Sequence, residues 1–178
     1  MYKKIGFIVS LIVLAAASRL LPHPPNFTPI AGMALFGGAV FLKKKWAFAV
    51  PLGAMLLSDI LIGLITGADA FGFHSTLPAV YLTFAITVCM GFALRRERGA
   101  FRVGSLSLAA SLLFFVITNL AVWAEGIYYE KTVAGLWACF TAAIPFFHYT
   151  VLGDALYVTL LFGAMAFAEM KLFRPSQA

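Results

Sequence analysis

Charged residues are scarce in this sequence, and most of them carry one sign. Of 178 residues, 7 are Asp or Glu and 13 are Lys or Arg, while 62% are hydrophobic. So little polar surface cannot cover a water-soluble domain. The composition therefore predicts an integral membrane protein. It argues against a soluble nucleic-acid-binding protein, although the net charge is +6.

Motifs for nucleotide binding and hydrolysis are also missing. The sequence contains no P-loop, no G-x-S-x-G and no H-E-x-x-H. Its two cysteines, Cys89 and Cys139, have neither metal-site nor redox spacing and are interpreted as small apolar side chains. We expect that the protein is not an enzyme, that it has no intrinsic cofactor and that it cannot hydrolyse ATP itself.

Apolar segments occupy most of the chain. A membrane-spanning helix needs about 20 apolar residues, and the short alternating segments of an outer-membrane barrel do not occur. The expected spans are roughly 4–21, 28–42, 46–66, 77–94, 104–124 and 149–168. Residues 1–178 are thus predicted to form a single all-α membrane domain with six transmembrane helices.

Basic residues lie almost entirely on one side of these spans. Only Arg19 and Lys131 fall on the other side. The positive-inside rule then predicts that both termini are cytoplasmic and that the loops at 22–27, 67–76 and 125–148 are external. Segment 134–147 is too short to cross and ends near Pro145, so it is predicted to be a short helix across the external mouth.

The first segment has a second interpretation. A basic start, an apolar stretch and Ala15-x-Ala17 are also typical of a cleavable signal peptide. Cleavage would leave five spans and an external N-terminus, so we favour a retained first span.

Three polar residues interrupt the spans at similar depths. At 1.5 Å per residue, Asp59 lies about 10 Å from the outer end of its segment, and Asn119 and Asp154 lie about 7 Å from the outer ends of theirs. Such residues usually face a bundle interior or a water-filled cavity, although they also bridge helices by hydrogen bonds. We expect the three to line one cup that is open outward.

Aromatic and polar residues in the external loops are expected to form the rim of this cup. Anchoring in the headgroup belt accounts for part of them. The prolines of "PHPPNFTP" suggest a rigid first loop, and Gly67 and Gly72 suggest a mobile third one. The candidate ligand-binding residues are Asp59, Asn119, Asp154, Asn26, Phe73, His74, Tyr81, Trp123 and Tyr128.

All three histidines are external, which raises the question of a metal. No His-x-x-x-His or H-x-x-E-H pair supports a preformed metal site. A single histidine is enough to serve as axial ligand to a metal that an organic molecule already holds. His74 is the candidate for this role.

The stretches "TPIAGMALFGGAVF" and "WAFAVPLGAMLLSDILIG" resemble the second and third spans of the substrate-binding S-components of energy-coupling-factor vitamin transporters. The stretch "FFVITNLAVWAEGIYY" resembles an uncharacterised bacterial family of S-component-like proteins. This resemblance implies a multi-pass protein of the bacterial inner membrane that takes up a vitamin-like small molecule, with an energy-coupling ATPase module as the candidate partner. The alanines of the first span are contiguous instead of spaced as Ala-x-x-x-Ala. That departure favours a solitary transporter, as in the cobalamin branch.

Two hypotheses about function follow. The first is a binding and uptake protein for a vitamin-like micronutrient, with cobalamin or another corrinoid as the leading substrate. The second is a membrane scaffold or assembly factor that transports nothing. A bundle packed solid at the depth of Asp59 would favour the second.

Overall fold

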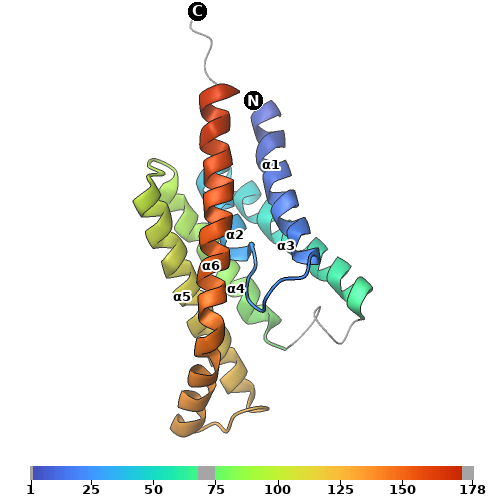
Figure 1. Ribbon diagram of the computed structural model, residues 1–178, viewed down its shortest axis with the longest axis vertical. Helices are drawn as coiled ribbons and strands as arrows, with labels where there is room; N and C mark the ends of the chain where they lie inside the picture. Colours follow the sequence, from blue (N-terminus) through green and yellow to red (C-terminus); the bar gives the residue numbers. More distant parts are fainter. Residues whose placement is uncertain (1, 68–74, 174–178) are drawn as a thin grey trace, which may run out of the picture.

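The computed structural model describes residues 2–67 and 75–173, which form helices and connecting loops without strands. The helices form a single bundle (Figure 1). The α-helices are α1 (Tyr2–Ala17), α2 (Ile30–Val40), α3 (Lys44–Thr66), α4 (Leu77–Gly91), α5 (Ala100–Glu125) and α6 (Val133–Lys171), and two 3-10 turns are η1 (Ser18–Leu20) and η2 (Phe92–Leu94). The start of α1 and the end of α6 lie at the same end of the bundle.

Helix α2 is the centre of the bundle. Ten of its eleven residues are buried, and it contacts α1, α3, α4, α5 and α6. A helix that is apolar on every face is stable only when protein or lipid surrounds it. The short sequence "IAGMALFGGAV" satisfies this condition because its small residues let the neighbouring helices approach from all sides.

The closest helix contact joins α2 to α4 through two glycines. A Cβ atom built on Gly38 would clash with the carbonyl oxygen of Val88 and lie 2.9 Å from the Cα of Gly91. A Cβ on Gly91 would clash with the carbonyl oxygen of Leu35. Because these obstacles are backbone atoms, no side-chain rotation relieves them.

An arginine satisfies the last carbonyl groups of α2. Arg95 donates from Nε to the carbonyl of Gly38 at 3.0 Å and from Nη2 to that of Phe41 at 2.8 Å. Its guanidinium also lies 4.2 Å from the ring centroid of Phe92. Carbonyls at a helix C-terminus lack intrahelical partners, so this side chain ends α2 at the basic end of the bundle.

Four helical segments are long and apolar enough to cross a membrane: Lys44–Thr66, Leu77–Leu94, Ala100–Glu125 and Val133–Lys171. The protein is therefore an all-helical membrane protein. At 1.5 Å per residue, α2 is only about 16 Å long, which is about half of a hydrocarbon core. The expected count of six spans and the cytoplasmic position of both termini stay predictions.

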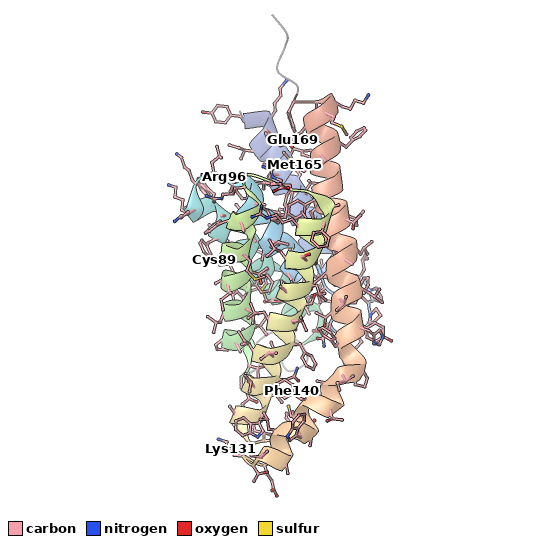
Figure 2. All side chains as sticks on the ribbon, turned by 90° about the vertical axis from the view of Figure 1, so that its left-hand side faces the viewer. Cys89, Arg96, Lys131, Phe140, Met165 and Glu169 are labelled. Atoms are coloured by element: carbon pink, nitrogen blue, oxygen red, sulfur yellow. The ribbon has the colours of Figure 1, made fainter. Side chains whose placement is uncertain are left out.

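The short separate helix predicted for 134–147 is wrong. That segment is the first part of α6, which continues through Pro145 without a break. Proline removes one helical hydrogen bond and bends a helix, but neighbouring packing can keep the helix continuous. Figure 2 shows the result: the part of α6 that carries Phe140 is inclined to the longer part that carries Met165.

We predict that Gly91→Ala lowers the free energy of unfolding by about 1–3 kcal/mol, the usual cost of overpacking a core. Thermal unfolding in detergent micelles measures the change. Gly6→Ala is the matched control because Gly6 is exposed and has no atom within 4 Å of an added Cβ. Equal stability of the two variants would contradict the α2–α4 contact.

Candidate functional site

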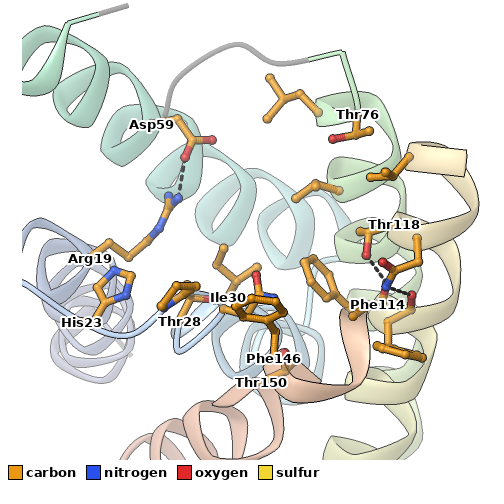
Figure 3. Close-up of a pocket in the computed structure, with 18 of the residues that line it drawn as sticks. Arg19, His23, Thr28, Ile30, Asp59, Thr76, Phe114, Thr118, Phe146 and Thr150 are labelled. Carbon is orange, nitrogen blue, oxygen red and sulfur yellow. Dashed lines mark hydrogen bonds and ion pairs between the residues drawn. The ribbon is translucent and has the colours of Figure 1, made fainter. Parts of the chain in front are cut away.

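A cavity of about 810 Å³ lies at the end of the bundle opposite the start of α1. Its walls come from η1 and the loop after it, the end of α3, the start of α4, the end of α5 and the first half of α6. Ile30, the first residue of α2, also lines it. Figure 3 shows Arg19 and Asp59 on one side, Phe114 and Thr118 on the other, and Ile30 and Phe146 between them.

The ion pair between Arg19 and Asp59 is the main electrostatic feature of the cavity. Arg19 Nη2 lies 2.6 Å from Asp59 Oδ1, and the two side chains are 11% and 4% exposed. Arg19 also donates to the hydroxyl of Ser58 and to the carbonyl of Met55. Two charges this far from water must be paired and hydrogen-bonded to be tolerated. Among the described residues that line the cavity, these are the only Lys, Arg, Asp or Glu side chains.

Two tyrosines extend this polar group to other helices. The hydroxyl of Tyr81, on α4, donates a hydrogen bond to Asp59 Oδ2 at 2.9 Å. The hydroxyls of Ser18 in η1 and Tyr157 in α6 are 2.6 Å apart. The turn η1 is thereby connected to α3 by Arg19 and to α6 by Ser18. These hydrogen bonds lie behind Arg19 and Asp59, the two charged residues of the network that line the cavity.

The opposite wall is aromatic. Phe114 and Phe115 on α5, and Phe146 and Phe147 on α6, line the cavity. The rings of Phe115 and Phe147 have centroids 5.0 Å apart, within the range of favourable aromatic pairs. A ligand in this space would meet a charged wall on one side and flat apolar faces on the other.

Asn119 adds a polar group next to the aromatic wall. Its amide nitrogen donates to the carbonyl of Phe115 at 2.7 Å, and Thr118 makes the same kind of bond to Phe114 at 2.7 Å. With the amide nitrogen bonded inside its own helix, the side-chain oxygen of Asn119 is the atom suited to accept from a ligand.

The proline-rich first loop forms part of the wall, with Pro22, His23, Pro25, Asn26 and Thr28 in the lining. Asn26 has a φ of 64°, a left-handed conformation that asparagine tolerates better than most residues. Two prolines of the loop thus lie against the cavity, where they fix the backbone φ angles.

Asp154 does not belong to the lining of this cavity. It is 3% exposed and accepts a hydrogen bond from Ser111 Oγ at 2.6 Å, between α5 and α6. The shared cup expected from equal depth therefore contains Asp59 and Asn119 without Asp154. Depth along a span fixes the height of a residue but not the face of the helix on which it lies.

Other predicted site residues lie beside the cavity. Tyr81 reaches it through Asp59. Trp123 donates from Nε1 to the carbonyls of Glu130 and Thr132 and so fixes the loop before α6. Tyr128 is 77% exposed, while its neighbour Tyr129 lines the cavity. Phe73 and His74 lie outside the described residues, so the proposed axial ligand stays a prediction.

Sequence reasoning missed Arg19 and the pair Phe114 and Phe115. Arg19 had a signal: it was one of two basic residues on the outer side, and a buried carboxylate elsewhere needs a cation. The phenylalanines had none, because an apolar residue in a span faces lipid as often as a cavity. The described residues contain no group of three or more His, Cys, Asp or Glu that could hold a metal ion.

A family model matches residues 1–177, and it is described as a family of unknown function, DUF6580. No curated protein and no solved structure matches the chain.

We predict that Arg19→Met lowers the free energy of unfolding by about 3–5 kcal/mol, because it leaves Asp59 charged and unpaired in a buried site. The double variant Arg19→Met/Asp59→Leu should recover most of the loss. Thermal unfolding of both single variants and the double variant gives the coupling energy. Lys131→Met, which removes an exposed cation from the same end, should change little; a loss equal to that of Arg19→Met would contradict the role of the ion pair.

Proposed function

The chain belongs to the DUF6580 family, and we propose that it is a membrane protein that binds a small amphipathic molecule in the cavity beside Asp59. The cavity itself carries the proposal. Its volume of about 810 Å³ falls in the range of small-molecule sites, about 300–1,000 Å³. Mostly apolar walls with a few placed polar groups are typical of such sites.

The position of the cavity supports uptake from outside. It lies at the end opposite Lys4, Arg98 and Glu169, where the basic residues gather. With six spans in a bacterial inner membrane, both termini cytoplasmic and the basic end inside, the cavity faces outward. Capture there is the first step expected of an S-component-like protein for a vitamin-like micronutrient, acting alone or with an energy-coupling ATPase module.

A corrinoid such as cobalamin remains the leading substrate. Its flat amphipathic ring suits a wall of phenylalanines opposite polar groups. His23 lines the cavity, and its Nδ1 lies 3.0 Å from the carbonyl of Pro24. When Nδ1 donates to that carbonyl, Nε2 keeps the lone pair that a metal needs. His23 thus joins His74 as a candidate for the imidazole that approaches cobalt.

The scaffold hypothesis predicts solid packing at the depth of Asp59. The structure instead has a cavity next to that residue. Side chains that line an empty cavity lose van der Waals contacts, and a purely structural role gives no reason for that loss. We therefore place binding of a small molecule ahead of a purely structural role.

We predict that a small molecule copurifies with the full chain in mild detergent and is identified by mass spectrometry. Asn119→Ala should weaken its binding by about 1–3 kcal/mol, the cost of an unmade buried hydrogen bond. Asp59→Ala should do the same, with an added loss of stability. Ser105→Ala, an exposed change on the same helix as Asn119 that leaves the cavity intact, should bind as the wild type does.

Titration with cobinamide and cobalamin tests the corrinoid separately. Binding with an altered absorption spectrum, lost in His23→Ala or in His74→Ala, identifies the imidazole. If neither compound binds, corrinoids are not the substrates. The cavity proposal is then decided by the molecule that copurifies. Full binding by Asn119→Ala and Asp59→Ala would refute the cavity as the site.

We predict that Lys44→Cys in a cysteine-free background is labelled by a membrane-impermeant maleimide only after the cells are opened. Tyr128→Cys should be labelled in intact cells. The reverse pattern would show that the basic end and the cavity face the opposite sides from those proposed.

A further inference from the structure

A second hollow lies on the side of the bundle, between α5 and α6. It has a volume of about 410 Å³ and is lined by residues between Arg98 and Ser111 on one side and between Val151 and Ala166 on the other. Gly104 and Gly163 lie in its walls, and a Cβ atom built on either would have no atom within 4 Å. Unlike Gly38 and Gly91, these glycines leave space that the rest of the described chain does not fill.

The length of this α5–α6 groove limits what can occupy it. From Ala100 to Ser111 the helix rises about 16 Å, which is close to the thickness of one leaflet and about half of the hydrocarbon core. The hydrogen bond from Ser111 to Asp154 lies at the far end. A transmembrane helix of a partner would need a groove along the whole bundle, whereas one acyl chain needs only this length.

Charge at the Arg98 end of the groove favours an anionic occupant. Basic side chains outnumber acidic ones there: Lys3, Lys4, Arg95, Arg96, Arg98, Arg102 and Lys171 stand against Glu97 and Glu169. Figure 2 shows Arg96 and Glu169 at this end and Lys131 at the other. A cluster of basic residues at the membrane surface attracts anionic lipid headgroups.

Arg98 connects the groove to this charge. It lines the groove and its side chain is 30% exposed. Its Nη1 donates to Glu169 Oε1 at 3.3 Å, while Lys4 holds the same oxygen at the shorter distance of 2.8 Å. A guanidinium has five N–H donors, so Arg98 can bind a phosphate oxygen while keeping this contact.

We propose that the α5–α6 groove binds one anionic phospholipid, with an acyl chain between Gly104 and Gly163 and the phosphate at Arg98. The lipid comes from the leaflet at the basic end. This site is separate from the cavity beside Asp59 and does not depend on the function proposed for that cavity.

The experiment uses the full chain in phosphatidylcholine nanodiscs that contain a minor share of phosphatidylglycerol with a photoactivatable diazirine on one acyl chain. After irradiation, labelled peptides are mapped by mass spectrometry. We expect labelling within 100–111 and 151–166, competed by unlabelled phosphatidylglycerol but not by phosphatidylcholine or by soluble glycerol phosphate.

Two variants test the site: one fills the groove with a larger side chain, and the other removes the positive charge at its end. Gly104→Leu should lower labelling about tenfold, since its side chain takes the place of several methylene groups of the lipid. Arg98→Gln should lower the preference for phosphatidylglycerol about fivefold, the effect of one surface charge. The matched controls are Gly6→Leu, at another exposed glycine with open space around it, and Arg102→Gln, a cation outside the groove that pairs with Glu97.

Three results would overturn the proposal. The first is equal labelling of Gly104→Leu and Gly6→Leu, and the second is a phosphatidylcholine probe that labels the groove as strongly as phosphatidylglycerol. The third is a dimer of the chain that Gly104→Leu disrupts, because it would show that a second copy occupies the groove.

Discussion

The structure depends on a central helix that is too short to span the membrane by itself. Helix α2 is packed on all sides, and Gly38 brings it against the backbone of α4 at Gly91. Arg95 binds its last carbonyls at the basic end. Its first residue, Ile30, reaches only to the cavity. Because α2 covers about 16 Å of a roughly 30 Å core, the space that a longer central helix would fill remains hollow.

The loop that leads into α2 has to close that space without a helix, and this requirement explains its composition. Backbone at membrane depth is tolerated when it is buried in protein or lines a cavity. Prolines reduce the number of unsatisfied N–H groups in such a loop and fix its backbone. Arg19 and Ser18 then connect the start of the loop to α3 and α6. A buried ion pair adds little net stability compared with apolar packing, so its contribution here is to fix the position of η1.

The helical class, the membrane setting and most helix positions could be predicted from hydropathy alone, because spans of about 20 apolar residues dominate the chain. Three features could not. The continuity of α6 through Pro145 depends on packing that sequence does not display, and the helix face occupied by Asp154 depends on rotation rather than depth. The pairing of Arg19 with Asp59 joins residues 40 positions apart in the chain, although each was noticeable as a charge in an apolar environment.

Asp154 lies between the cavity and the α5–α6 groove, and this position explains its buried hydrogen bond better than a role in ligand binding. Thr150, one turn before it, lines the cavity, whereas Val151 and Ala155 line the α5–α6 groove. The bond from Ser111 to Asp154 joins α5 to α6 at the end of the groove nearest the cavity. Nearer the start of α6, the ring of Phe115 also packs against the rings of Phe140 and Phe147 and so adds to the contact between the two helices. The Ser111–Asp154 contact therefore lies between the cavity and the α5–α6 groove, which occupy different parts of the same helix pair.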